Sequence, residues 1–501
     1  MKYVFVAFVL ISLVLYSLVC LGTMSNEMAI GLPIFLAFAE LMIWFHYTQK
    51  TRYGSWMHPV IFFFFSYMIV YFQVPYSYIC FGLEDSFPRV DGYEYIAHGA
   101  VLSLVGLSFF FLGYAALFSP EFKSMTLPLQ TNKEYFFTPE ICQGIISLLL
   151  PFAVIFGFLA IVLNPQLLAG EYGTRSDYSV PWYVAIFTKL AKMQFTIICT
   201  LETIRLLHFK IINLTTYFHL YNKKVLILAM LFILPYLRAG DRGEFLYMGV
   251  IVCAPYYLFF HRLNFVLFAS VLLLSSIFLT YVGATRTGDA SNPLTERISD
   301  TIMMKDISLS PLRPDLWPTR ELASSYQCYV CAMDLKYSHA LPSNFFPGRY
   351  SLYSFLRFSP DYVLAYLPFY HNTGEYPELG GVITDKLQRG RRGESGVAGL
   401  GSVSLAEPLV DFGDIGVPIY FFLFGAFLYW LEKSCFKNLS VYGMMGYIFF
   451  TYQVIYVNRS EILSVWSIYF WNAVELFMIQ IFFRINYSTQ WSHAKKTQSI
   501  R

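Results

Sequence analysis

One short polar segment between two apolar stretches carries the residue types that bind phosphate. The segment 237–244 reads LRAGDRGE, in which Arg238 and Arg242 flank Asp241. Its two glycines let the backbone reverse, and the backbone N–H groups at the start of the next helix form an anion site together with arginine side chains. Arginines at helix ends also reach toward water simply to place their charge at a membrane surface. We favour the phosphate site, because the loops on this side of the membrane, described below, carry few other positive charges.

Five further arginines fall at comparable positions. Arg286 directly follows an apolar stretch, and Arg459 lies in a four-residue polar segment between two others. Arg389, Arg391 and Arg392 add three positive charges beside glycines that permit close approach of the backbone to a phosphate. Anchoring at the membrane interface would explain the positions of Arg286 and Arg459 equally well. Arg389, Arg391 and Arg392 could equally be a run of charged residues exposed to water.

Two lysines stand inside the apolar stretch 181–204. Lys189 and Lys192 are three residues apart, so they share one face of a helix within the hydrocarbon region. A charged side chain is costly there and indicates either function or pairing with an opposite charge. We therefore treat both lysines as candidate substrate ligands. The carboxylates that would instead pair with them are Glu40, Glu202 and Glu475.

A carboxylate precedes the tenth apolar stretch without an obvious structural role. The segment 401–416 contains Glu407, Asp411 and Asp414. The two aspartates suit the first turn of the following helix, where a negative charge is stabilised. Glu407 is expected outside that helix, kept ionised by basic neighbours, and therefore able to act as a general base. The rival bases are Asp241, Glu394 and His371.

The composition places these residues in a membrane protein. Of 501 residues, 56% are hydrophobic and 13% are charged, and the mean hydropathy is +0.51, whereas soluble domains carry about 25% charged residues. A net charge of +3 provides no basic field for nucleic acid, so nucleic acid is excluded as a main partner. No Walker loop, GxGxxG, EF-hand or HExxH motif occurs, and the pair Cys328-x-x-Cys331 has no second pair. The sequence therefore predicts no cofactor and no metal.

Twelve apolar stretches approach the length of about 20 residues that crosses a bilayer. The seventh and eighth are short and are separated only by the turn around 238–244. The expected fold class is therefore an all-α polytopic membrane protein with about twelve transmembrane helices. The predicted stretches are 3–21, 28–46, 58–76, 98–118, 141–163, 181–204, 225–237, 245–260, 263–282, 415–431, 440–457 and 462–483.

The distribution of Lys and Arg over the loops predicts the orientation. Cytoplasmic loops are richer in Lys and Arg, and a cytoplasmic N-terminus gives sixteen such residues inside and five in the short outside loops. Both termini are then cytoplasmic, and the long stretch 283–411 lies outside as a mixed-charge periplasmic loop subdomain. Its segment 352–370 is aromatic but interrupted by charges and proline, which suits a helix lying in the membrane interface. The remaining parts are a bundle of about nine spans, three further spans and a cytoplasmic tail, at 1–282, 412–484 and 485–501.

Three features together resemble the Wzy-type polymerases of O-antigen and related oligosaccharide repeat units. They are the sequence GDRG at 240–243 opening a mid-chain helix, the long outer loop, and SLAE at 404–407 followed by DFGDIG at 411–416 before a late span. The resemblance covers about 225–435, and the rest of the chain matches only in hydropathy. It implies a glycosyltransferase-C-like arrangement of helices.

The resemblance implies a polysaccharide polymerase of the bacterial inner membrane. Such an enzyme transfers a growing glycan from undecaprenyl diphosphate to a lipid-linked repeat unit at the periplasmic face. Its partners are undecaprenyl-diphosphate-linked oligosaccharides, the lipid bilayer, a flippase and a chain-length regulator, the polysaccharide co-polymerase. The arginines and the two lysines named above would hold the diphosphate, and Glu407 or Asp241 would accept the proton of the acceptor hydroxyl.

Other membrane proteins share parts of this pattern. An O-antigen ligase uses the same donor but delivers the glycan to lipid A-core, and a phage-type O-antigen glucosyltransferase is a third enzyme with similar hydropathy. A lipid-linked oligosaccharide flippase also has about twelve spans, but it needs no outer subdomain and should line its interior with charges. We therefore expect a polymerase, with the ligase as the nearest alternative and the flippase as the alternative from another class.

Overall fold

The computed structural model shows a helical protein. It describes residues 1–49, 55–81, 95–118, 137–165, 167, 182–239, 242–284, 317–338, 341, 345–356, 379–389, 402–438 and 440–498. Within these ranges helices are joined by turns and short irregular segments, and no strand occurs. The predicted class, an all-α polytopic membrane protein, is confirmed.

Nine helices within the described ranges are long and apolar enough to cross a membrane. Each lies close to a predicted stretch, but the last continues as a helix through the segment that was predicted to be a tail. The nine are α1 (Lys2–Cys20), α2 (Asn26–Gln49), α3 (Pro59–Phe81), α4 (Ile96–Leu117), α5 (Pro139–Val162), α7 (Trp182–Leu207), α10 (Arg242–Pro255, continued by η2), α19 (Gly416–Phe436) and α21 (Ile462–Gln498).

The other three predicted stretches are also helices. α9 (Lys223–Arg238) follows α8 (Leu214–Leu220) at a bend of 98°, while α11 (Phe265–Ala284) and α20 (Val441–Val457) contain shorter apolar segments. The sequence did not predict α8, which begins where the side chain of Asn213 accepts a backbone hydrogen bond. All twelve stretches are therefore helical, and membrane crossing by these last three remains a prediction.

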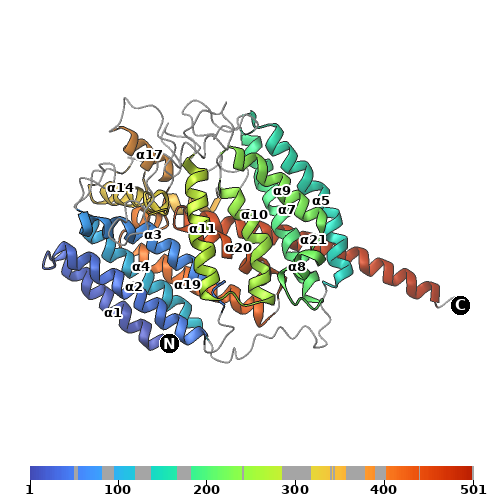
Figure 1. Cartoon of the computed structure of the whole chain (residues 1–501), viewed down its shortest axis with the longest axis horizontal. Helices are drawn as coiled ribbons and strands as arrows, with labels where there is room; N and C mark the ends of the chain where they lie inside the picture. Colours follow the sequence, from blue (N-terminus) through green and yellow to red (C-terminus); the bar gives the residue numbers. More distant parts are fainter. Residues whose placement is uncertain are drawn as a thin grey trace.

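α4 is the centre of one half of the bundle. It is buried along most of its length and packs against α1, α2 and α19 (Figure 1). Two glycines allow the contact with α19: a Cβ at Gly113 would lie 2.0 Å from the carbonyl oxygen of Phe422, and a Cβ at Gly425 would lie 2.0 Å from that of Phe110. Small residues permit such close backbone approach between membrane helices. Two helices far apart in the sequence are thereby held face to face.

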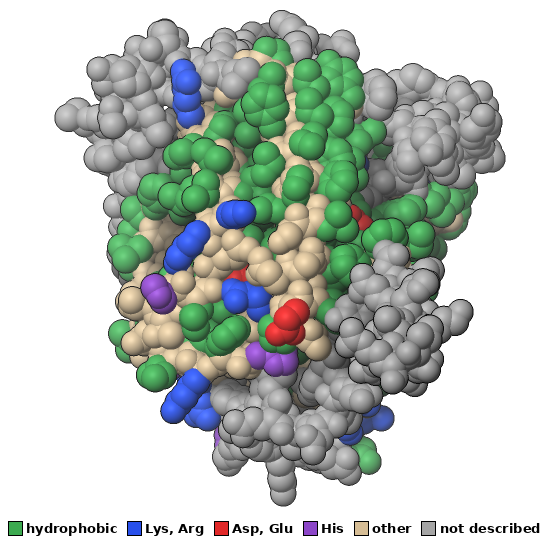
Figure 2. All heavy atoms as spheres, turned by 90° about the vertical axis from the view of Figure 1, so that its right-hand side faces the viewer, with side chains coloured by type: hydrophobic (Ala, Val, Ile, Leu, Met, Phe, Trp, Pro, Cys, Tyr) green, Lys and Arg blue, Asp and Glu red, His purple; other side chains and the backbone are tan. Residues whose placement is uncertain are grey.

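The second half contains α5, α7, α9, α10, α20 and α21 (Figure 1). α5 packs along α7, and α10 packs against α9 and α20. α20 also contacts α3 and α19, so it joins the two halves. Figure 2 shows one side of the molecule, where apolar side chains cover much of the upper part and several Lys, Arg and His side chains lie below them. An exposed apolar surface of this kind suits a lipid environment.

α10 changes its hydrogen-bonding pattern before it ends. At Tyr256 it passes into the π-helix η2 (Tyr256–Phe260). The hydroxyl of Ser55, just before α3, donates to the carbonyl of Tyr257 at 3.3 Å and accepts from the backbone N–H of Leu263 at 3.2 Å. This serine therefore ties the end of α10 to the start of α3.

Among the described residues between α11 and α19, five short helices gather at one end of the bundle, which we call the short-helix end. They contact the later half of α3 and the starts of α4, α19 and α21. Residues 321–336 are helical with a break at 324–325, and residues 357–370 of the predicted interfacial helix lie outside the described residues. The five are α13 (Arg320–Ala323), α14 (Tyr326–Tyr337), α15 (Arg349–Leu356), α17 (Leu379–Arg389) and α18 (Ala406–Phe412).

Candidate functional site at the turn between α20 and α21

The turn 458–461 connects α20 to α21 at the short-helix end and is fixed by buried polar groups. Asn458 is fully buried, and its amide nitrogen donates to the hydroxyl of Ser66 on α3 at 2.6 Å. Its amide oxygen accepts from Ser404 at 3.3 Å, and the Ser404 hydroxyl lies 2.8 Å from that of Tyr71, also on α3. Buried polar groups that are satisfied in this way fix one arrangement. The turn, α3 and the segment before α18 are thus held together.

The two charged residues of this turn lie in different surroundings. Arg459 lines an apolar cavity, described below, and also lies close enough to Cys328 of α14 for its charge to lower the thiol pKa against the larger effect of burial. Glu461 is buried and lies near Glu407 of α18, whose pKa it helps to raise. A segment of four residues therefore places a guanidinium at the cavity and a carboxyl group against α18.

Glu407 lies outside α19, as the sequence predicted, but in surroundings that the sequence did not predict. It stands in the first turn of the short helix α18 and is 0% exposed. Burial raises its pKa well above the usual range, and the carboxyl groups of Glu461 and Asp411 raise it further. The N–H of Leu463 and the hydroxyl of Ser354 lie near enough to lower the pKa of Glu407 somewhat, although neither forms a hydrogen bond with its carboxyl group.

These surroundings favour the protonated form of the Glu407 carboxyl group. The sequence predicted basic neighbours that would keep Glu407 ionised, whereas the charged groups that act on it here are the acids Glu461 and Asp411, and packing of α18 against α14, α15 and α19 replaces water. Two neighbouring buried carboxyl groups can still take part in proton transfer, because each makes ionisation of the other harder and one can accept a proton while the other remains protonated.

Asp411 has a structural task that differs from the predicted one. Instead of standing at the start of α19, it lies in α18 and accepts hydrogen bonds from the first turn of α15. The donors are the N–H of Tyr350 at 3.2 Å, the N–H of Ser351 at 2.7 Å and the hydroxyl of Ser351 at 2.5 Å. Burial raises the pKa of Asp411, and these donors oppose the rise. Asp411 therefore holds α15 against α18, beside Glu407.

Asp414 lies just before α19, as predicted, and binds two tyrosines. It accepts from the hydroxyl of Tyr337 at 2.6 Å and from that of Tyr16. The Tyr337 hydroxyl also lies 2.8 Å from Nε2 of His98. These contacts tie α1, α4 and α14 to the turn before α19.

The predicted phosphate-binding turn lies between α9 and α10, and one of the intramembrane lysines reaches it. The ammonium group of Lys192 on α7 forms an ion pair with Glu244 in the first turn of α10. The hydroxyl of Tyr452 on α20 donates to the carbonyl of Gly243 at 3.1 Å. The start of α10 is therefore bound both to α7 and to α20, the helix that precedes Arg459.

Lys192 pairs with none of the three carboxylates that the sequence offered as alternative partners. The sequence did not single out Glu244, because it was treated as the end of a loop rather than as the start of a helix facing α7. The three carboxylates that were expected to pair with the lysines have other partners: Glu40 accepts from Ser108, Glu202 pairs with Arg205, and Glu475 accepts from Gln194.

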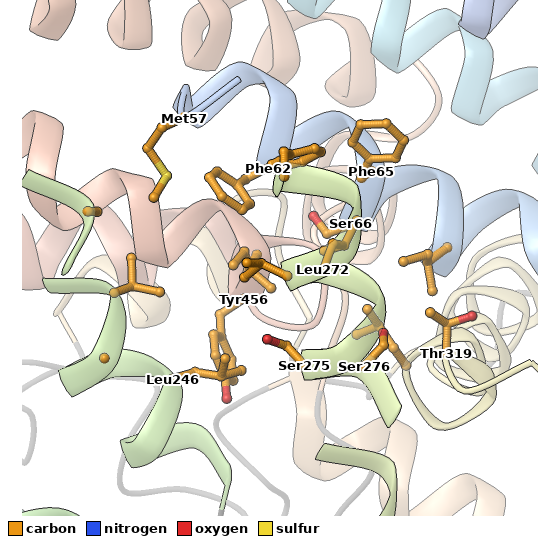
Figure 3. Close-up of a pocket in the computed structure, with 18 of the residues that line it drawn as sticks. Met57, Phe62, Phe65, Ser66, Leu246, Leu272, Ser275, Ser276, Thr319 and Tyr456 are labelled. Carbon is orange, nitrogen blue, oxygen red and sulfur yellow. The ribbon is translucent and has the colours of Figure 1, made fainter. Parts of the chain in front are cut away.

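An apolar cavity of about 410 Å³ lies between α3, α10 and α11 (Figure 3). Its polar lining consists mainly of the hydroxyls of Ser66, Ser275, Ser276 and Thr319, together with Arg459. Sequence reasoning missed this cavity, because an empty volume depends on how helices from distant parts of the chain pack. The only local signal is the small residues in otherwise bulky apolar helices.

The other predicted site residues are placed less completely. Arg238 ends α9 and is exposed, and Lys189 on α7 is half-buried. Arg242 begins α10 and Arg389 ends α17, but only their backbone positions are described. Asp241, Arg286, Arg391, Arg392, His371 and Glu394 lie outside the described residues.

Sequence reasoning also missed a buried arginine. Arg349 begins α15, is 0% exposed, and its guanidinium carbon lies 5.7 Å from the centre of the Tyr350 ring. Nothing in its local sequence distinguishes it from a loop residue.

No protein-family model matches the chain, and neither a curated protein nor a solved structure shows significant similarity to it.

Proposed function

We propose that this protein is an inner-membrane glycosyltransferase that joins undecaprenyl-diphosphate-linked oligosaccharide repeat units into O-antigen or a similar surface polysaccharide. One observation carries the proposal. The turn 458–461 holds Arg459 at an apolar cavity and Glu461 near the buried Glu407. One small region thereby combines a cavity for a lipid tail, a cation for an anionic leaving group and carboxyl groups that can accept a proton.

The reaction would use these groups in the following way. A hydroxyl of the acceptor sugar attacks the anomeric carbon of the donor glycan, and the bond from that carbon to the diphosphate oxygen breaks. Arg459 stabilises the negative charge that develops on the diphosphate. The proton of the attacking hydroxyl passes to the pair formed by Glu407 and Glu461 when one of the two is ionised.

The arrangement of helices supports an outward-facing site. If all twelve helices cross the membrane, the short-helix end lies on the side opposite the basic loops, which is the periplasmic side. The turn before α10, the turn 458–461 and the start of α19 all lie at the end where α20 finishes. Lipid-linked repeat units would then reach the site after a flippase has moved them outward.

Deletion of the gene, followed by complementation, tests this function. In the deletion strain we expect single repeat units on lipid A-core and no ladder of longer chains. Absence of glycan from the core with intact lipid-linked polymer would identify a ligase instead. Retention of single lipid-linked units on the cytoplasmic side would identify a flippase.

Two substitutions test the site itself. Glu407→Gln removes a proton-exchanging group, and Arg459→Lys keeps the charge but loses the planar fork that binds two phosphate oxygens. We expect each to reduce polymer about tenfold or more at normal protein level. The matched control is Asp414→Asn, whose amide oxygen can accept from one tyrosine while its amide nitrogen donates to the hydroxyl of the other, and it should give a normal ladder. A normal ladder from both site variants would remove the turn 458–461 from the reaction.

A further inference from the structure

The cavity between α3, α10 and α11 has the shape of a slot along the helices. Its α10 wall runs from Phe245 to Ala254, a length of about 14 Å at 1.5 Å per residue. Figure 3 shows Phe62 of α3, Leu246 of α10 and Leu272 of α11 around the same space. A long apolar slot inside a bundle fits a flexible chain better than a compact solute.

The cavity is charged at a single point. Of the described residues that line it, only Arg459 carries a formal charge. Thr319 lies at the short-helix end as well, where its hydroxyl donates to Gln73 of α3 at 2.7 Å. Met57, Tyr257 and Leu263 line the cavity as well, near the start of α3 and the end of α10. The slot therefore offers a cation at one end and apolar contacts over the rest, an arrangement that complements an anionic amphiphile.

The volume limits the size of the occupant. An engineered cavity of about 150 Å³ holds one benzene ring, so the 410 Å³ found here hold roughly fifteen carbon atoms. That is one chain of about three isoprene units. A phospholipid would have to leave one of its two chains outside. The aromatic rings of Phe62, Phe65, Phe245 and Phe268 suit the methyl branches and double bonds of an isoprenoid.

We propose that this cavity binds the first three or so isoprene units of one polyprenyl chain, with the adjoining diphosphate at Arg459. The choice of an isoprenoid rests on the proposed function, whereas a single-chain anionic amphiphile follows from the cavity alone. The rest of a longer chain leaves beside α11, where Val271 is 52% exposed and Leu274 is 66% exposed. The protein thus recognises the part of the lipid nearest the diphosphate and leaves the remainder in the bilayer.

Photolabelling of the full-length protein tests this site directly. The probe is farnesyl diphosphate with a diazirine at the far end of its chain, added to protein in phosphatidylethanolamine nanodiscs. We expect saturable labelling that maps by mass spectrometry to α3, α10 and α11. Undecaprenyl diphosphate should compete with the probe, whereas phosphatidylglycerol should not.

A pair of glycines provides matched variants. Gly249 lines the cavity, and Gly144 lies on α5 away from it; an added Cβ meets nothing within 4 Å at either position. Gly249→Phe should fill the slot and lower labelling about tenfold or more, while Gly144→Phe should leave labelling unchanged. Arg459→Gln should weaken labelling by farnesyl diphosphate but not by a farnesol photoprobe.

Several outcomes would overturn the proposal. They are labelling that maps elsewhere, equal labelling of Gly249→Phe and wild type, or equal competition by phosphatidylglycerol. The proposed function can fail separately. Labelling that maps to the cavity in a protein whose deletion leaves the surface polysaccharide unchanged would support the lipid site and reject the polymerase. Normal polymer from Gly249→Phe would reject the lipid site and leave the polymerase intact.

Discussion

At the scale of single residues, Glu407 shows how burial changes the chemistry of a carboxyl group. A carboxylic acid with a raised pKa holds its proton in the folded protein and loses it more readily when the chain unfolds. The folded state then binds more protons than the unfolded state at neutral pH. The contribution of Glu407 to the free energy of unfolding is greatest below its ordinary pKa of 4.5. This contribution is lost as the pH rises through the raised pKa of the folded state.

Replacement of Glu407 by Gln should therefore stabilise the protein at higher pH. The amide keeps the size of the protonated acid but cannot ionise, so the variant should unfold at a higher temperature than wild type at about pH 8 and at a similar temperature at about pH 5. Thermal unfolding of the detergent-solubilised protein across this range measures the difference. Parallel curves for the two proteins would show that Glu407 ionises freely in the folded state.

At the scale of elements, one ion pair between two helices can be tested by substitution. The ion pair between Lys192 and Glu244 links α7 to the start of α10, and the carboxylate side is almost buried whereas the lysine is 35% exposed. Removing one partner of a pair in a poorly hydrated place leaves the other charge without compensation, which costs more than removing both.

Glu244→Gln should accordingly destabilise the protein by about 1–3 kcal/mol, below the loss for a fully buried pair. The double variant Lys192→Met with Glu244→Gln should recover much of that loss, because no uncompensated charge remains. Unfolding in mixed micelles by denaturant, performed on both single variants and the double variant, gives the coupling free energy. A coupling near zero would mean that the two side chains do not interact in solution.

The contact between α4 and α19 offers a second test at this scale. Gly425→Val places side-chain atoms where the Phe110 carbonyl already lies, and backbone atoms cannot move aside as a flexible side chain can. We expect loss of the monodisperse folded protein on size-exclusion chromatography. Gly144→Val, in a helix with open space, is the control and should elute as wild type. Normal behaviour of Gly425→Val would show that the two helices lie further apart.

Sequence patterns predicted the helices well and their partners poorly, for a physical reason. Hydropathy acts over a contiguous window, so the stretch predicted at 98–118 appears as a helix from Ile96 to Leu117. The environment of Glu407 depends on α15, the start of α21 and the turn 458–461, which are distant in the chain and meet only in the fold. Glu244 was missed for the same reason, since its partner lies 52 residues earlier.

At the scale of the whole molecule, the direction of insertion decides which compartment the site faces. Reporter fusions after Arg89, Arg175 and Lys336 should give a periplasmic signal, and fusions after Lys210 and Lys437 a cytoplasmic one, because of the uneven distribution of positive charge. Alkaline phosphatase and fluorescent protein fusions measure the two cases. A cytoplasmic signal after Lys336 would place the short-helix end inside the cell and contradict an enzyme acting on exported substrates.

The π-helical turn at Tyr256–Phe260 has a further consequence for the whole bundle. A π turn holds more residues than an α turn, and such turns arise when one residue is added to a helix. Without the additional residue, everything beyond it would be rotated by about 100°. Tyr257 would swing out of the cavity wall, and the carbonyl that Ser55 binds would face elsewhere. The part of the cavity wall near Tyr257 therefore depends on the number of residues in this helix as well as on their types. An evolutionary insertion or deletion of one residue here would change the shape of the cavity even if every lining residue kept its type.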